Sequence, residues 1–174
     1  LARRQLFERL AAAAQGTSDE KLARGLAAVY ATQKGSSPFD SPAERFELPA
    51  DALVLLRDAA LAGKPNGFVA QLWEWTAEVL VQKRWVPQVY EHVGPLAKAW
   101  APWPTLERVL ARADAESLEF EGAKKRLDAL RETEQARDPV YWLELGNIEE
   151  QLDRATDAIA AWRKSCELAP DYLY

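Results

Sequence analysis

Apolar residues recur along this chain at the three- and four-residue spacing of helices that bury one face. Leu6 and Leu10 share one face of residues 1–15, and Leu22, Leu26 and Val29 share one face of residues 17–34. No window alternates between apolar and polar positions as a strand does, so we predict an all-α chain. The same spacing predicts further helices over residues 50–62, 68–83, 86–99, 104–116, 119–135, 139–152 and 155–168.

Polar caps and prolines predict where several of these helices begin and end. Thr17 followed by Glu20 is the spacing of a capping box, so we expect the second helix to begin with Thr17 as its cap. Asp138 before Pro139 predicts a capped start with proline in the first turn. Pro170 cannot continue a helix and is expected to close the last one.

One long irregular segment divides the chain. Residues 35–49 contain three prolines as well as glycine and serine, which makes a continuous helix there improbable, although a short helix from Ser41 stays open. The sequence KPNG at residues 64–67 predicts a turn. We expect an N-terminal hairpin with its Pro-rich connection over residues 1–48, and one continuous helical stack over residues 49–174.

The paired helices show a period. Gln88, Ala123 and Ala158 each stand near the start of the second helix of a pair, and they lie 35 residues apart. Helix pairs that repeat every ~34 residues are typical of stacked repeat proteins. The spacing therefore predicts one supersecondary unit used repeatedly.

The last unit resembles a tetratricopeptide repeat over nearly its whole length. Its family pattern is met in order by the tryptophan, the Leu-Gly pair, the alanine, the second aromatic and the closing proline, which are Trp142, Leu145, Gly146, Ala158, Trp162 and Pro170. Gly146 and Ala158 are expected to be small because the two helices touch there. The unit before it matches more loosely, through Leu110, Ala111, Phe120, Ala123 and Leu127, and the one before that through Trp85.

This resemblance implies a fold and a binding surface. The fold would be a right-handed α-solenoid of antiparallel helix pairs, clearest at residues 139–172 and readable over residues 69–174, with the N-terminal third helical but unassigned. Members of the family line a concave groove with the first helix of each pair. Carried over to this chain, the groove positions are Trp73, Ala77, Leu80, Arg108, Arg112, Ala115, Leu143, Asn147 and Glu150.

The groove positions suggest how a partner is held. Arg108 and Arg112 are four residues apart on one helix face, so they could clamp a carboxylate or an acidic peptide. Trp73 and Leu143 would be apolar anchors beside them. The alternative is that both arginines form ion pairs in solvent with Glu107, Glu116 or Asp114.

Residues that could carry catalysis are scarce. His92 is the only histidine and Cys166 the only cysteine, and we expect a structural histidine and a small buried cysteine. No cluster of metal ligands and no phosphate-binding loop is present, so we predict no metal, no cofactor and no enzyme activity. Four tryptophans are expected in the core, and Trp100 with Trp103 either staple a turn or form an exposed contact; the four are Trp75, Trp85, Trp142 and Trp162.

Charge and hydropathy narrow the partners. The net charge is −5, residues 88–174 alone carry 11 basic and 17 acidic side chains, and no basic stripe for nucleic acid is present. No apolar run reaches the ~20 residues of a membrane span. We therefore expect a partner that is a protein or a peptide of unknown identity, while self-association stays open.

These features favour a non-catalytic protein–protein interaction module, an adaptor or scaffold that binds a peptide or protein in its groove. We expect a cytoplasmic location, and a targeting segment outside this sequence stays open. The chain contains no methionine, so a regulatory or assembly domain excised from a larger enzyme or machine is the second interpretation. A helical enzyme, the third, would need an open pocket around His92.

Overall fold

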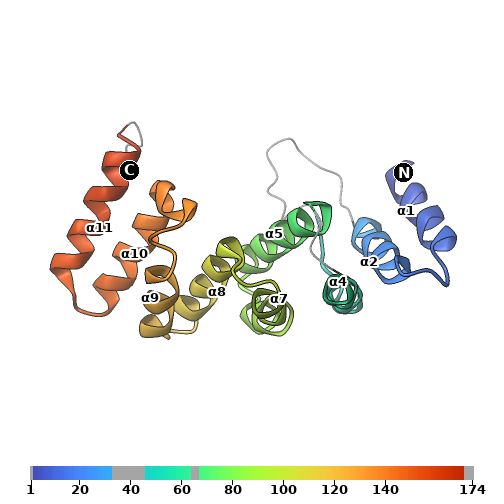
Figure 1. Cartoon of the computed structure of the whole chain (residues 1–174), viewed down its shortest axis with the longest axis horizontal. Coiled ribbons are helices and arrows are strands. Elements are labelled where there is room, and N and C mark those ends of the chain that lie inside the picture. The colour runs from blue at the N-terminus through green and yellow to red at the C-terminus, as the bar shows by residue number, and fades with distance from the viewer. Residues whose placement is uncertain (1, 33–45, 64–66, 171–174) are drawn as a thin grey trace.

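The chain is helical throughout the part that the structure describes. The computed structural model describes residues 2–32, 46–63 and 67–170, and within these ranges only helices and their connections occur. Figure 1 shows the helices side by side in an elongated row, with the two termini at opposite ends. The predicted all-α class is therefore confirmed. The short helix expected from Ser41 and most of the turn at residues 64–67 lie outside the described residues.

Most of the helices agree closely with the expected ranges. In chain order they are α1 (Ala2–Ala13), α2 (Glu20–Ala31), α4 (Ala50–Ala62), α5 (Gly67–Gln82), α6 (Val86–Gln88), a π-helical turn (Val89–Val93), α7 (Gly94–Ala99), α8 (Pro104–Glu116), α9 (Phe120–Asp128), a 3-10 turn (Glu134–Arg137), α10 (Pro139–Gln151) and α11 (Ala155–Leu168). The start of α10 is as expected, because the Asp138 carboxylate accepts a hydrogen bond from the backbone N–H of Val140 at 2.9 Å.

The predicted capping box of α2 is wrong in its details. The helix begins at Glu20 after Asp19, and Thr17 lies in the preceding turn, where its hydroxyl donates to the carbonyl of Ala14. The Glu20 carboxylate does reach back, but it accepts from the backbone N–H of Gly16 at 2.8 Å. The two residues thus close the turn between α1 and α2 instead of capping the helix.

The helix expected over residues 86–99 is interrupted by a π-helical turn at Val89–Val93. Pro95 has no backbone N–H, so the regular bond to the carbonyl four residues earlier, that of Glu91, cannot form. A local change to wider hydrogen bonding is a common response to such an interruption. The segment stays helical and continues as α7 after Gly94.

The helix expected over residues 119–135 ends early, at Asp128. Its last turns tighten into shorter-range bonds, from the N–H of Leu130 to the carbonyl of Leu127 and from the N–H of Thr133 to the carbonyl of Leu130. The Thr133 hydroxyl then accepts from the N–H of Gln135 and starts the 3-10 turn. No proline or glycine marks this end, which explains why the apolar spacing alone overextends the helix.

The last three helix pairs are α5 with α6 and α7, α8 with α9, and α10 with α11. The turn that follows the first helix has the same backbone geometry in all three pairs. It places a non-glycine residue in the left-handed region, with φ of 55° at Arg84, 64° at Leu118 and 58° at Asp153. The next residue has φ and ψ of −87° and 59°, −89° and 59°, and −100° and 60° in the three turns. Its N–H donates to the carbonyl five residues earlier at 3.0, 2.9 and 2.9 Å. The same turn is thus built three times, at spacings of 34 and 35 residues.

These turns correct the repeat alignment of residues 69–103, the first of the three repeat units expected from the sequence. Counting from them, the residue equivalent to Ala123 and Ala158 is Val89, which is fully buried, and not the half-buried Gln88. The same count aligns the buried small residues Ala77 and Ala111 with Gly146. Small residues at this position let the two helices of a pair approach closely.

The last pair shows why the residue is small. A Cβ added to Gly146 would overlap the indole ring of Trp162, which lies across it from α11. Ala158 on α11 is also buried, with 1% of its surface exposed. The expectation that Gly146 and Ala158 are small because their helices touch is therefore confirmed.

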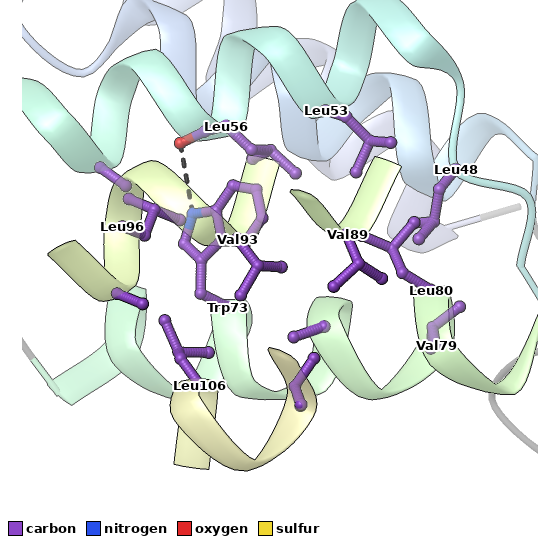
Figure 2. Close-up of a cluster of buried hydrophobic side chains, with 14 of the residues drawn as sticks. Leu48, Leu53, Leu56, Trp73, Val79, Leu80, Val89, Val93, Leu96 and Leu106 are labelled. Carbon is purple, nitrogen blue, oxygen red and sulfur yellow. Dashed lines mark hydrogen bonds between the residues drawn. The ribbon is translucent and has the colours of Figure 1, made fainter. Parts of the chain in front are cut away.

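The first core joins α2, α4, α5, α7, α8 and the π-helical turn. Its centre is Trp73, whose indole N–H donates to the carbonyl of Leu56 at 3.4 Å (Figure 2). Leu26 and Val29 of α2 belong to the same cluster as Leu53 of α4. The core therefore crosses residue 48, where the sequence suggested a division.

The second core joins α8, α9, α10 and α11. Tyr141 is fully buried, its hydroxyl donates to the carbonyl of Leu127 at 2.8 Å, and burial raises its pKa to about 12. Helix α8 serves both cores, because Leu106 and Val109 face the first and Ala111 faces the second. This shared helix links the two clusters.

The tryptophans follow the expectation in part. Trp75, Trp85 and Trp142 are half-buried and pack against one of the two cores, as predicted. Trp100 and Trp103 stack on each other with ring centroids 4.7 Å apart, and both pack against the first core. Of the two alternatives left open for this pair, the structure shows the turn staple.

Gly146→Ala is expected to destabilise the protein by about 1–3 kcal/mol, because the new methyl group must displace the Trp162 ring. The free energy of unfolding from urea titration measures this. In a Trp162→Leu background the same substitution should cost clearly less, since the ring is gone. Equal costs in both backgrounds would show that the two residues do not touch.

Candidate binding site

A hollow of about 380 Å³ lies between α8 and α10, over the end of α9. Its lining combines small and aliphatic side chains with charged and amide groups at the rim, namely Ala111, Arg112, Ala115, Glu116, Leu118, Leu127, Glu144, Asn147 and Ile148. We call it the α8–α10 hollow. Three of the expected groove residues line it: Arg112, Ala115 and Asn147.

The groove positions assigned to α5 are wrong. Trp73, Ala77 and Leu80 are completely buried in the first core, so no partner can touch them. The cause is the spacing of 35 residues, which places this unit one residue out of register with the turns. In the corrected register Glu74 and Glu78 take the places equivalent to Arg108 and Arg112, and both remain partly exposed.

Arg112 on α8 connects α5, α8 and α10, which are the first helices of three successive pairs. Its Nη1 donates to both carboxylate oxygens of Glu78 on α5, at 2.9 and 2.7 Å. Its Nε donates to Glu144 on α10 at 2.5 Å. The guanidinium is therefore bound by carboxylates on both sides.

Arg108 is more deeply buried, with 8% of its side chain exposed. Its Nε donates to Glu144 at 2.8 Å and its Nη1 to Asp138 at 2.6 Å. Burial opposes the charged guanidinium, but hydrogen bonds and charge from Glu144 and Asp138 outweigh it and raise the pKa of Arg108 above its ordinary value. Its Nη2 is buried without a hydrogen-bond partner among the described residues.

Both sequence interpretations of these arginines are therefore wrong. Neither arginine is free to clamp an acidic peptide, because carboxylates of this chain already bind both. The carboxylates that bind them are also not Glu107, Glu116 or Asp114, the partners expected in the alternative interpretation. Glu107 and Asp114 bind Arg126, and Glu116 lies 3.8 Å from Arg84.

Asn147 is held in one orientation by α11. The Trp162 indole N–H, which can only donate, lies 3.1 Å from Oδ1 of Asn147. Oδ1 is therefore engaged with α11, and Nδ2 is the amide atom that can donate at the hollow, which Asn147 lines. Of the other expected groove residues on α10, Leu143 is half-buried and Glu150 is exposed.

Leu118 at the rim was missed by the sequence interpretation. It has 74% of its surface exposed, the highest value among the exposed large apolar residues of the described chain, and it occupies the left-handed turn position. The equivalent residues in the other two turns, Arg84 and Asp153, are polar. With the corrected register, this difference could have been read from the sequence.

His92 is buried, with 2% of its surface exposed, so no open pocket surrounds it. Its Nδ1 lies 3.4 Å from the Arg57 guanidinium, and Glu91 lies near both groups. Burial, together with the positive charge of Arg57, lowers the pKa of His92 below its ordinary value of 6.5, although Glu91 and Asp58 oppose this. The expected structural role agrees with this position.

Cys166 differs from its expectation, because it is exposed on α11 and not buried. Among the described residues, no group of histidine, cysteine and acidic side chains could hold a metal ion. The helices in these ranges are also too short or too polar to cross a membrane.

Arg108→Ala is expected to reduce the free energy of unfolding by about 2–3 kcal/mol, because it removes a nearly buried guanidinium that donates charge-assisted hydrogen bonds to Asp138 and Glu144, although Glu144 keeps Arg112. Arg112→Ala should cost only about 1 kcal/mol, because Glu144 keeps Arg108 and Glu78 is partly exposed. Urea unfolding of the two variants measures the difference. Equal losses would contradict the central position given to Arg108.

The free energy of unfolding should fall as the pH is lowered through about 6.5, the ordinary histidine pKa, towards 5. The unfolded chain takes up a proton on His92 from about pH 6.5 downward, whereas the lowered pKa of the folded state delays that uptake. His92→Gln should lose this part of the pH dependence in urea unfolding at several pH values. The lowered pKa values of Asp58, Asp128 and Asp138 act only in more acidic solution.

Comparison with known proteins identifies no relative. No family model, no curated protein and no solved structure matches the chain.

Proposed function

We propose that the chain is a non-catalytic protein–protein interaction module of the tetratricopeptide type, a right-handed α-solenoid that binds a peptide or protein on the face of its first helices. The observation that carries the proposal is the turn built three times, with one backbone geometry at spacings of 34 and 35 residues. Self-similarity at a fixed spacing of this length is the pattern expected of stacked helix pairs, and it supports the proposal.

The face formed by the first helices supports a binding role. Helices α5, α8 and α10 are joined there by the bonds of Arg112 to Glu78 and Glu144. These bonds hold successive pairs in a common register and leave the α8–α10 hollow open beside them. A hollow that combines an apolar floor with a small number of placed polar groups is a usual form of a recognition site.

The proposal predicts that partners bound by the intact chain depend on the α8–α10 hollow. The chain carrying both Leu118→Asn and Asn147→Ala should lose most captured protein in an affinity pull-down quantified by mass spectrometry. Asparagine suits the left-handed turn position, and Asn147→Ala removes only an exposed hydrogen bond from the Trp162 indole N–H, which water can replace, so folding should be preserved.

Ile159→Asn on α11 is the matched control, because Ile159 is an exposed aliphatic residue, 47% of whose surface is exposed, and it does not line the hollow. This variant should capture the same proteins as the wild type. If the double variant retains every protein that the control retains, the hollow is not the binding site and the proposal fails.

A further inference from the structure

We infer that the α8–α10 hollow takes a peptide segment in which an aliphatic side chain stands next to lysine or arginine. The inference rests on the proposed function and adds the chemistry of the partner. Two independent features of the hollow carry it: the exposure and backbone conformation of Leu118, and the distribution of charge around the rim.

Leu118 is unfavourable for folding in two ways. A leucine in the left-handed region is less stable than one in the ordinary right-handed helical conformation, because its Cβ crowds the backbone carbonyl. Its side chain, with 74% of its surface exposed, recovers little of this through burial. The chain places polar residues at the two equivalent turn positions, Arg84 and Asp153, so the turn itself does not need leucine.

The position of Leu118 indicates what the leucine is for. It lies at the edge of the hollow, whose floor contains Ala111, Leu127 and Ile148. An aliphatic side chain of a partner could enter beside the small Ala111 and be covered by Leu118. Burying such a group on both proteins would remove apolar surface from water and return the free energy that the exposed leucine costs.

The charges around the hollow favour a basic partner. Arg108 and Arg112 are surrounded by Glu78, Glu144 and Asp138, so this network already has one more carboxylate than guanidinium. Glu116 adds another carboxylate at the rim, 42% of its side chain is exposed, and its nearest cation, Arg84, is 3.8 Å away and itself mostly exposed. An acidic peptide would have to displace Glu78 or Glu144 from Arg112, whereas a lysine or arginine would meet Glu116 directly.

Asn147 explains why the partner is a peptide segment. Trp162 orients its amide so that Nδ2 can donate at the rim, which suits a backbone carbonyl of an extended chain. The aliphatic side chain of the peptide would then contact the floor of the hollow. Its lysine or arginine would meet Glu116, and its backbone carbonyl would accept from Asn147.

Fluorescence anisotropy with matched peptides tests the inference. The probes are fluorescein-labelled, C-terminally amidated octapeptides of glycine and serine with a central leucine flanked by lysines, by glutamates or by serines, and a lysine peptide with serine in place of leucine. The lysine–leucine peptide should bind the intact chain about tenfold more tightly than each of the others. Its affinity should fall as salt is added.

Variants locate the binding. Leu118→Asn should weaken the lysine–leucine peptide about tenfold with a urea midpoint that is unchanged or higher, and Glu116→Gln should weaken it about threefold. Ile159→Asn and Glu167→Gln on α11 are the matched controls for exposed aliphatic and acidic residues and should have no effect.

The outcomes separate this inference from the proposed function. If the glutamate or serine peptide binds as tightly as the lysine peptide and depends on Leu118, the choice of a basic partner is wrong while the binding site stands. If no peptide binds in a manner that depends on Leu118, the inference is overturned. The proposed function then stands or falls with the pull-down.

Discussion

The close approach of two helices across a tight left-handed turn is the constraint on which the rest of this structure depends. The turn inside each of the last three pairs requires a positive φ at Arg84, Leu118 and Asp153, and a hydrogen bond from the N–H of the following residue to the carbonyl five residues before it. Such a turn brings the paired helices together at once, so a small residue such as Gly146 is needed where they meet. In the last pair the Trp162 ring lies directly on Gly146 at this contact.

Because the pairs are stacked in this way, the ion pairs among α5, α8 and α10 follow from where these three helices lie. Successive pairs place Glu78, Arg112 and Glu144 side by side, and Arg108 closes the network with Asp138 at the start of α10. A half-buried network of this kind adds little net stability over apolar packing, because its charges must be desolvated. It does penalise any arrangement in which one charge loses its partner, and we expect it to act mainly by holding α5, α8 and α10 in register.

The residues that could be predicted from sequence are those whose role follows from local spacing. The helices, the cap at Asp138 and the small residue at Gly146 all follow from patterns within one or two turns of helix. The groove residues of α5 could not be predicted in this way. An error of one residue in the repeat spacing rotates a position around the helix by about 100°. Here that error selects the buried Trp73 in place of the accessible Glu74. The ion partners of Arg108 come from another helix, so no local pattern indicates them.

The same network limits which partner the hollow would recognise under the proposed function. A free arginine pair would select a carboxylate, but these arginines are neutralised within the chain, and the carboxylates outnumber them. The contribution that remains at the rim is an acidic one, from Glu116, together with the apolar side chain of Leu118. Leu118 is unfavourable for the turn, and the equivalent turns have polar residues there, so we attribute the combination to the proposed recognition and not to folding. A cation would choose the partner, and apolar contact would supply most of its affinity.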